Sequence, residues 1–198
     1  MLAAGRGERL RPLTDRTPKV LLPVGGVPLV DLAIARLRPY VDAVAVNAHY
    51  LHEQLSAHLA DQDVHMSVEE PEALGTAGAL GHLRPWIAGR DVLLTNGDVW
   101  YSAPPPELAD GGTRMRLLAV HDPTRADYGE WRYAGSCYLP WRYVRSLPDT
   151  PSGLHEVCWR EAWATNTLDL VPYTGQYIDC GTPSDYRAAN RAAAQLHG

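Results

Sequence analysis

The residues from Leu2 to Lys19 combine a glycine-rich turn with two cationic side chains. A short apolar segment leads into Gly5 and Gly7, Arg9 follows, and Lys19 comes ten residues after Arg9. Without Cβ atoms, the two glycines can take positive φ angles and let main-chain N–H groups approach an anion closely. The arginine and the lysine would add positive charge beside that turn. The pattern therefore predicts a binding site for phosphate groups.

Lys19 is the only lysine among the 18 lysine and arginine residues of the chain. Its ammonium group is a compact point charge on a flexible stem, whereas a guanidinium is planar and presents a fork of donors. A site that needs the first group would not accept the second. We therefore expect Lys19 to have a role that an arginine cannot fill.

The spacing of this stretch excludes two familiar nucleotide-binding motifs. A dinucleotide-binding fingerprint requires a third glycine where Leu10 stands. A P-loop requires a lysine and a serine or threonine directly after its last glycine. The stretch is instead a Gly-x-Gly-x-x-Arg loop with a delayed Pro18-Lys19.

Two acidic residues stand at the ends of predicted strands. Asp98 follows Asn96 and Gly97, and Asp179 comes two residues before Gly181. Ligands of open α/β sheets bind beyond the carboxyl ends of strands. Carboxylates are the hard oxygen ligands that Mg²⁺ prefers, although a single Gly-Asp or a single capping Asp is also common in turns. Together, Asp98 and Asp179 predict a Mg²⁺ site.

The elements that must position these residues alternate between strand and helix along the whole chain. Strands are expected at residues 41–47, 64–68, 91–95, 114–120, 133–139 and 177–179, and helices at 29–37, 51–59, 77–86 and 183–194. Such alternation predicts an α/β fold with a mainly parallel mixed sheet and helices on both faces. We expect a single-domain, three-layer α/β/α Rossmann-like arrangement over residues 1–198.

The N-terminal strand is expected to be clipped, because only residues 1–4 precede the first glycine. Two explanations stay open: the start codon is assigned late, or the first strand is short. A clipped central strand would lower the stability of the fold.

The composition is that of an ordinary globular protein, with 198 residues of which 45% are hydrophobic and 21% charged. A net charge of −5 argues against a nucleic-acid-binding protein. No apolar run approaches the roughly 20 residues of a membrane span, and no signal peptide is visible. The three cysteines lack metal-ligand spacing. We therefore expect a cytoplasmic protein with neither nucleic-acid nor membrane partners.

The loop, Arg9 and Pro18-Lys19, at these separations, closely resemble the signature of the sugar-1-phosphate nucleotidyltransferases, which make NDP-sugars from NTPs. Asn96-Gly97-Asp98 and the run Asp179-Cys180-Gly181-Thr182-Pro183 match later motifs of that family in the right order. The resemblance implies a nucleotidyltransferase fold, an NTP and a sugar-1-phosphate as substrates, and Mg²⁺ held by Asp98 and Asp179. It also implies roles for the other matching residues: catalytic ones for Arg9, Lys19 and Asp98, and nucleotide contacts for Leu2, Ala3, Gly5 and Gly7.

A further segment, Leu74-Gly75-Thr76-Ala77-Gly78, resembles the base-binding turn of the family at the start of a helix. Gly75 would let backbone groups reach the base edge, and the resemblance implies nucleotide contacts for Gly75 and Thr76. Taken as a lone motif, the segment is only the start of a helix, with Thr76 as its cap. Just upstream, Glu69 or Glu70 offers a carboxylate that accepts from guanine N1–H and N2–H, whereas uracil favours an amide. Glu70, taken as the nucleotide-binding member, moves the preference slightly from UTP toward GTP. The alternative is that both glutamates merely solvate a loop.

The prediction of sugar-binding residues rests on two weaker resemblances. Gly135 lies in a Tyr-Ala-Gly-Ser turn similar to the one whose glycine backbone contacts the sugar, and Glu156 resembles an acid that binds sugar hydroxyls. Many relatives also insert a strand pair ending in Glu-Lys-Pro, which is absent here, so Arg132 or Arg160 would have to replace its lysine. This departure places the chain nearer the short members that act on manno-, heptose- or muramic-type sugar phosphates.

Two other functions stay open. A binding-only relative, such as a nucleotide-sugar sensor or a regulatory subunit, is favoured by the clipped strand and the missing Glu-Lys-Pro segment. It is opposed by the four intact charged residues of the motifs. A glycosyltransferase would usually hold its metal with an Asp-x-Asp motif, and Asp61-Gln62-Asp63 lies in a polar turn that is unsuited to this role.

Overall fold

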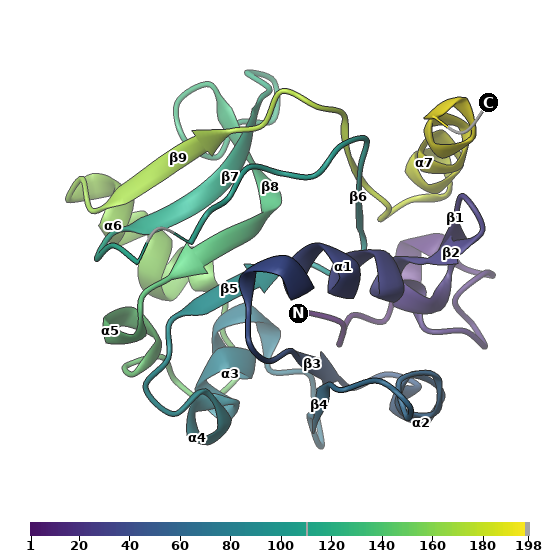
Figure 1. The fold of residues 1–198 in the computed structure, drawn as a ribbon, viewed down its shortest axis with the longest axis horizontal. Helices are drawn as coiled ribbons and strands as arrows, with labels where there is room; N and C mark the ends of the chain where they lie inside the picture. Colours follow the sequence, from purple (N-terminus) through teal and green to yellow (C-terminus); the bar gives the residue numbers. More distant parts are fainter. Residues whose placement is uncertain (110, 197–198) are drawn as a thin grey trace. The chain divides into compact units, whose positions relative to one another are not determined.

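The computed structural model describes residues 1–109 and 111–196, which form two compact units (Figure 1). The first unit comprises Met1–Glu70, Thr95–Pro104 and the chain from Gly175 onward, and the second comprises Pro71–Leu94 and Pro105–Thr174. Each unit combines helices with strands, which confirms the expected α/β class. That residues 1–198 act as one domain stays a prediction.

The first unit contains most of the motifs found in the sequence. Its helical segments are η1 (Glu8–Leu10), η2 (Lys19–Leu21), α1 (Leu29–Leu37), η3 (Arg38–Tyr40), α2 (His52–His58) and α7 (Pro183–Leu196). Its strands are β1 (Pro23–Val24), β2 (Val27–Pro28), β3 (Ala45–Ala48), β4 (His65–Val68), β6 (Val99–Tyr101) and β10 (Tyr177–Asp179). The expected helix at 29–37 and the expected strand at 177–179 are confirmed with the same bounds.

Strand pairing in the first unit brings the two metal ligands predicted from the sequence, Asp98 and Asp179, to the same end of a strand pair. β6 pairs antiparallel with β10, with Asp179 opposite Val99. Because the two strands run in opposite directions, the first residue of β6 lies next to the last residue of β10. Asp98, which directly precedes β6, therefore lies beside Asp179, the last residue of β10.

The expected N-terminal strand is reduced to a single residue, Leu2. This residue forms parallel bridges with both Asn47 and Asn96. Its N–H donates to the Thr95 carbonyl at 2.9 Å, and its carbonyl accepts from the Gly97 N–H at 2.8 Å. Leu2 thus holds the beginning of the glycine-rich loop between β3 and the segment that leads to Asp98.

The hairpin formed by β1 and β2 was not expected from the sequence. Its two-residue loop is Gly25-Gly26, with φ angles of 60° and 83°. Positive φ at both loop positions matches the twist of an antiparallel pair, and Gly-Gly between apolar residues is a known hairpin signal. The signal was therefore present in the sequence.

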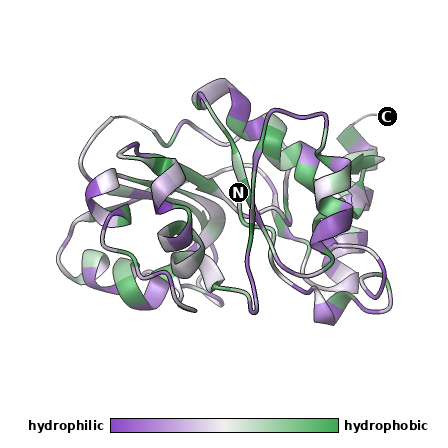
Figure 2. Cartoon of the chain, turned by 90° about the horizontal axis from the view of Figure 1, so that it is seen from below, coloured by the Kyte–Doolittle hydropathy of each residue, from purple (hydrophilic) through white to green (hydrophobic). Residues whose placement is uncertain are grey.

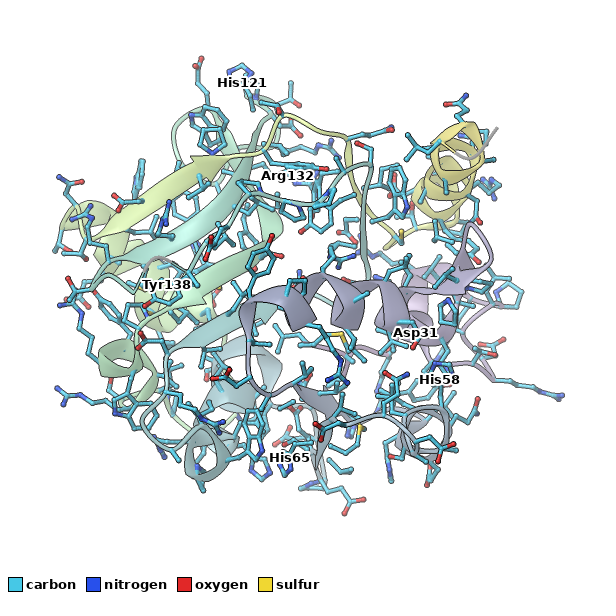
Figure 3. The ribbon with its side chains drawn as sticks, viewed as in Figure 1. Asp31, His58, His65, His121, Arg132 and Tyr138 are labelled. Carbon is cyan, nitrogen blue, oxygen red and sulfur yellow. The ribbon has the colours of Figure 1, made fainter. Side chains whose placement is uncertain are left out.

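A side-chain hydrogen bond and small side chains hold the helices of the first unit. Asp31 on α1 lies beside His58 on α2, with 2.9 Å between Asp31 Oδ2 and His58 Nε2 (Figure 3). Hydrophilic and hydrophobic residues are interspersed along the helices and strands (Figure 2). Three alanines of helix α7 are buried in a core cluster together with residues of β1, α1, β6, β10 and the segment at Cys180, namely Val24, Leu29, Trp100, Ile178, Cys180, Ala189, Ala192 and Ala193.

The second unit contains a mixed four-stranded sheet in the order β5-β8-β7-β9 (Figure 1). The strands are β5 (Val92–Thr95), β7 (Met115–His121), β8 (Trp131–Leu139) and β9 (Leu168–Pro172), and Thr95 itself is counted in the first unit. β7 pairs antiparallel with β8 and parallel with β9. The helical segments are α3 (Gly75–His82), α4 (Arg84–Ile87), α5 (Trp141–Val144), the π-helical turn η4 (His155–Trp159) and α6 (Arg160–Ala164).

The sequence predicted one helix at residues 77–86, and the structure divides this segment into α3 and α4. The division falls at Leu83, two residues before Pro85. A proline has no N–H to continue the helical ladder and tolerates only the first turn of a new helix. A single helix was therefore wrong, and Pro85 is the physical reason.

Candidate functional site

The centre of the candidate site is the ammonium group of Lys19, which meets two carboxylates. Lys19 Nζ forms a short ion pair with Asp98 Oδ2 and lies 3.8 Å from Asp179 Oδ1. The Lys19 side chain is only 9% exposed, whereas those of Asp98 and Asp179 are 29% and 36% exposed. A buried ammonium is stable only when it is paired, so the two carboxylates compensate its burial.

Lys19 is held in place by the glycine-rich loop. Gly7 has a φ of +64°, and a Cβ at this position would lie 2.9 Å from Thr14 Cγ2 and 3.1 Å from Lys19 Cβ. The Thr14 hydroxyl also donates to the Gly7 carbonyl at 2.8 Å. The need for glycine at residue 7 is thus confirmed by a positive φ and by close packing against the lysine stem. Gly5 is not among the residues with positive φ, and a Cβ there would meet nothing within 4 Å.

Arg9 lies against the glycine of the Asp-x-Gly-Thr-Pro motif. A Cβ at Gly181 would lie 2.6 Å from Arg9 Nη2 and 3.0 Å from Asp179 Oδ1. The guanidinium of Arg9 therefore occupies the space that any other side chain at residue 181 would fill. The sequence predicted the phosphate-neutralising arginine and the acidic motif separately, and the structure brings them together.

The rest of the Asp-x-Gly-Thr-Pro motif begins α7. The Thr182 hydroxyl accepts from the N–H of Asp185 at 3.2 Å and donates to its carboxylate at 2.6 Å, and Pro183 is the first residue of the helix. A threonine cap followed by proline at the first helical position is a typical helix start. The start of α7 thereby fixes the C-terminal end of the short segment that follows Asp179.

Cys180 connects the two acidic segments through its backbone, since its N–H donates to the Asp98 carbonyl at 3.0 Å. Its thiol is fully buried. Burial, together with the negative charge of Asp98, raises the pKa of the Cys180 thiol to about 12, and Lys19 opposes this shift. The thiol is therefore neutral near pH 7 and adds no charge to the site.

The two carboxylates fit a divalent cation of the Mg²⁺ type. Their oxygens already converge on one cationic atom, Lys19 Nζ, and both side chains are partly exposed. Mg²⁺ typically takes one or two protein carboxylates and completes its shell with water and substrate phosphates. Within residues 1–109 and 111–196, no group of three or more His, Cys, Asp or Glu side chains could hold a metal ion. Two carboxylates without a third protein ligand among the described residues thus suit a cation whose remaining ligands are water and substrate phosphates.

The two neighbouring glutamates after β4 occupy different environments. Glu69 is 1% exposed, and its Oε1 accepts from Asn47 Nδ2 at 2.6 Å. Glu70 is 74% exposed, and its Oε1 lies 3.9 Å from His52 Nε2. Of the two, only Glu70 presents its carboxylate to solvent, where a ligand could meet it. Asn47 was missed as a site residue, although a polar residue at the end of a buried strand is a signal.

The base-binding turn expected at residues 74–78 belongs to the second unit. Gly75 begins α3 with a φ of +70°, and a Cβ there would lie 2.6 Å from the Ser152 carbonyl oxygen. The Thr76 hydroxyl accepts from the Leu154 N–H at 2.8 Å. The nucleotide contact expected of Thr76 stays a prediction. The alternative, that Thr76 caps its own helix, is wrong, because the N-cap position is Leu74, without a side-chain cap. Instead, the Thr76 hydroxyl provides the hydrogen-bond acceptor for the backbone N–H of Leu154, the N-cap residue of η4.

The expected sugar-binding residues also lie in the second unit. Gly135 has a φ of +80° within β8, next to a register shift between β7 and β8, which is typical of a β-bulge. Glu156 is exposed on η4, and its carboxylate lies where a Cβ of Gly153 would stand. Of the two candidate replacements for the missing lysine, Arg132 Nη1 lies 3.9 Å from Asp122 Oδ2, and Arg160 is exposed at the start of α6.

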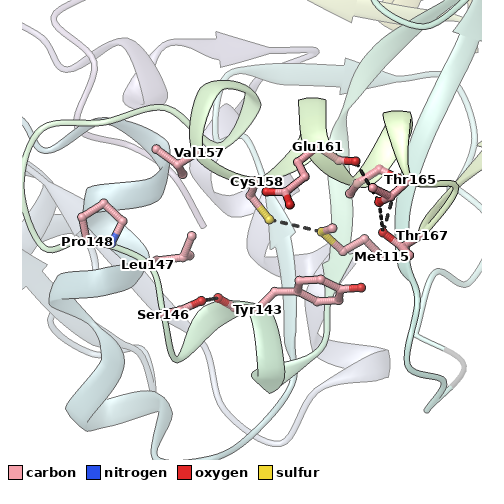
Figure 4. Close-up of a pocket in the computed structure, with 11 residues that line it drawn as sticks. Met115, Tyr143, Ser146, Leu147, Pro148, Val157, Cys158, Glu161, Thr165 and Thr167 are labelled. Atoms are coloured by element: carbon pink, nitrogen blue, oxygen red, sulfur yellow. Dashed lines mark hydrogen bonds between the residues drawn. The ribbon is translucent and has the colours of Figure 1, made fainter.

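A separate cavity of about 260 Å³ lies within the second unit, between α5, η4, α6 and the sheet (Figure 4). Cys158 and Met115 face each other there, with 3.4 Å between their sulfur atoms. Glu161 and Thr167 add polar groups to the lining. None of the residues expected in the site lines this cavity.

No helix in the described parts of the chain combines the length and apolar character needed to cross a membrane.

The fold is that of the sugar-phosphate nucleotidyltransferases. The inositol-1-phosphate CTP transferase of T. maritima superposes with a TM-score of 0.75 at 18% identity, covering 98% of this chain and 94% of that one. The UDP-glucose pyrophosphorylase of Acinetobacter baumanii superposes with a TM-score of 0.70 at 15% identity, covering 96% of this chain and 90% of that one. At these identities the likeness shows the fold, and it confirms the expected fold class.

The chain belongs to the family of MobA-like NTP transferase domains, whose profile matches residues 1–126. It is 40% identical over 105 residues to the N-acetylmuramate alpha-1-phosphate uridylyltransferase of Neisseria meningitidis serogroup B, a match that covers 50% of this chain and 46% of the relative. The chain spans between 24% and 46% of the length of three curated relatives that it matches.

Proposed function

We propose that this chain transfers a nucleotidyl group from an NTP to a sugar-1-phosphate in a Mg²⁺-dependent reaction, giving an NDP-sugar and pyrophosphate. The observation that carries the proposal is the convergence of Lys19 Nζ, Asp98 Oδ2 and Asp179 Oδ1 beside the glycine-rich loop. Family membership and the 40% identity to a uridylyltransferase support it. A cytoplasmic location, where NTPs are available, follows from the proposal.

The proposed reaction needs no protein nucleophile. An oxygen of the sugar phosphate attacks the α-phosphorus of the NTP in line, a new P–O bond forms, and the bond to pyrophosphate breaks. Catalysis then consists of positioning the reactants and neutralising charge that develops on the phosphates. Lys19 would neutralise the α-phosphate and the attacking phosphate, and Arg9 would stabilise the charge on the leaving pyrophosphate.

Asp98 and Asp179 would hold the Mg²⁺, which when bound supplies positive charge against the phosphate oxygens. In the structure both carboxylates are turned to the ammonium group of Lys19. When a phosphate approaches, Lys19 can turn toward it on its flexible stem, and the carboxylate oxygens become available. A rigid guanidinium would not make this exchange easily, which accounts for a lysine at this position.

The identity of the base depends on the exposed acid Glu70. Its carboxylate would accept from guanine N1–H and N2–H, which favours GTP slightly over UTP. The relative at 40% identity that is named a uridylyltransferase supports the opposite choice. For the sugar, Gly135 at the β8 bulge and the exposed Glu156 are the proposed contacts.

The decisive experiment measures pyrophosphate release with Mg²⁺ across a grid of NTPs and sugar-1-phosphates. Asp98→Asn and Lys19→Ala should each lower turnover by roughly a hundredfold, because each removes one charged side chain that is proposed to help stabilise the transition state. Asp61→Asn is the matched control, since Asp61 lies in an exposed turn. Full turnover in both site variants would disprove the assignment. Nucleotide binding without pyrophosphate release in any combination would instead support the binding-only alternative.

A further inference from the structure

Two buried side chains connect the end of β4 to the first residues of the glycine-rich loop. The Ala3 N–H donates to Asn47 Oδ1 at 2.7 Å, and Asn47 Nδ2 donates to Glu69 Oε1 at 2.6 Å. Asn47 is 2% exposed and Glu69 is 1% exposed. Burial of an amide and a carboxylate is costly unless both form hydrogen bonds. The contacts therefore form a connected polar network at the start of the loop.

The carboxylate of Glu69 determines which way the Asn47 amide faces. A carboxamide can be turned by 180°, which exchanges its oxygen and its nitrogen. An ionised carboxylate only accepts hydrogen bonds, so it requires the nitrogen of Asn47 on its side. The oxygen of Asn47 is then directed at the Ala3 N–H. Without an acceptor at residue 69, the turned amide would place a donor against that N–H.

Ala3 is the residue at which the regular pairing of the N-terminal segment ends. Leu2 is bridged on both sides by strand partners, and the next N–H, that of Ala3, is held by the Asn47 side chain. The loop begins two residues later at Gly5. The Asn47 side chain therefore continues, at Ala3, the contacts that hold the N-terminal segment against β3.

Glu69 is itself fixed by contacts of its backbone. Its N–H donates to the Ala48 carbonyl at 2.8 Å, and its carbonyl oxygen lies 2.9 Å from His49 Nδ1. Both partners belong to β3 or follow it directly. The carboxylate is thus anchored on the same strand that carries Asn47.

We propose that Glu69, acting through Asn47, is a positioning residue that holds the backbone of the nucleotide-binding loop at Ala3. The inference rests on the proposed function, because it takes the loop to be the nucleotide site. It assigns Glu69 a task different from base recognition, and it leaves Glu70 as the acid available to the base.

The test reverses the direction of the hydrogen bond between residues 47 and 69 and keeps the one from the Ala3 N–H to residue 47. Asn47→Asp should place two carboxylates against each other and break the connection. In the double variant Asn47→Asp/Glu69→Gln, the glutamine amide can donate to the aspartate, whose other oxygen accepts from the Ala3 N–H. The double variant keeps the side-chain sizes and the net charge of the wild type. Glu53→Ala, on the exposed face of α2, is the control.

Two quantities are measured for each variant: the amide exchange rate of Ala3 by NMR of ¹⁵N-labelled protein, and the Kd for nucleotide. We expect Asn47→Asp to raise both by about tenfold or more, and the double variant to return both to within about threefold of wild type. If the single variant does not fold, Asn47→Ala replaces it, and the recovery of a folded double variant with wild-type Ala3 exchange supports the inference.

Three results decide the outcome. Wild-type Ala3 exchange and wild-type Kd in Asn47→Asp would overturn the inference. Recovery of thermal stability in the double variant without recovery of the nucleotide Kd would also overturn it, since the role would then be only structural. If wild-type protein binds no nucleotide, the proposed function fails, and Ala3 exchange still shows whether Glu69 and Asn47 hold the loop.

Discussion

Lys19 and Asp98 form an ion pair across 79 residues of sequence, at the place where two carboxylates converge. The same ammonium lies 3.8 Å from Asp179. In the proposed Mg²⁺ site, a divalent cation would take the place that this ammonium holds between the two carboxylates. The single positive charge of Lys19 therefore offsets part of the negative charge of the two carboxylates.

Removal of the ammonium group should make the site a better receptor for a metal ion alone. We expect Lys19→Met to bind Mn²⁺ about tenfold or more tightly in the absence of nucleotide, because the metal no longer competes with the ammonium for Asp98 and Asp179. Calorimetric titration with Mn²⁺ measures this, and Arg16→Ala, which removes an exposed cation three residues before Lys19 in the sequence, is the control. Equal Mn²⁺ affinity in wild type and Lys19→Met would show that the ammonium does not occupy the metal position.

A methyl group at residue 181 should move Arg9 without unfolding the protein. The atom that a Cβ at Gly181 would meet most closely is Arg9 Nη2, at 2.6 Å, and it is the end of a flexible side chain that can shift. We expect Gly181→Ala to lower kcat/KM by about tenfold or more, because the charge proposed to meet the pyrophosphate is displaced. The melting temperature should stay close to that of wild type.

Kinetic assays and thermal unfolding, run on the same preparations, separate the two effects for Gly181. A large fall in melting temperature would show that Gly181 is needed for folding rather than for the placement of Arg9. Arg9→Ala provides the comparison, since the double variant Arg9→Ala/Gly181→Ala should be no less active than Arg9→Ala alone.

The two glycines of the loop should respond differently to alanine. At Gly7, with a φ of +64° and Thr14 Cγ2 2.9 Å from the new Cβ, alanine should lower the free energy of unfolding by about 1 kcal/mol or more. At Gly5, where a Cβ meets nothing within 4 Å, alanine should leave it unchanged. Urea unfolding measures both.

Nucleotide titration then tests what Gly5 does. If the loop backbone approaches the phosphates as proposed, Gly5→Ala should weaken nucleotide binding while the stability of the fold is kept. Unchanged binding in Gly5→Ala would mean that the close approach occurs elsewhere in the loop.

The thiol in the cavity of the second unit should react slowly at neutral pH. Burial, and to a lesser degree the charge of Glu161, raise the pKa of Cys158 to about 11. At pH 8 about one thiol in a thousand is then ionised, against about one in four for an ordinary thiol of pKa about 8.5. The rate of iodoacetamide alkylation, followed by mass spectrometry, should rise about tenfold per pH unit from pH 8 to pH 10.

The raised pKa also sets the sign of a stability effect. Because the folded protein releases this proton at higher pH than the unfolded chain, the contribution of Cys158 is full below about pH 8.5 and is lost as pH rises toward 11. Cys158→Ser should flatten this part of the stability curve. A thiol that alkylates at its full rate by pH 8 would contradict both expectations.

The residue types of the site were predictable from the sequence, because they depend on local chemistry. Gly7 in a left-handed turn, Pro183 at a helix start and a strand ending at Asp179 follow from backbone preferences over a few neighbouring residues. The hairpin at Gly25-Gly26 has an equally local signal in the sequence. Two or three adjacent residues suffice to specify each of these features.

Only the tertiary structure decided which of these residues meet. The antiparallel pairing of β6 with β10 brings Asp98 beside Asp179, and this pairing joins segments far apart in the chain. Two neighbouring glutamates likewise differ in burial: Glu69 is buried beside Asn47, whereas the Glu70 side chain faces solvent. Local preferences are the same for both glutamates. Their environments differ because long-range packing, which no short stretch of sequence encodes, determines which side chains are enclosed and which partners they find.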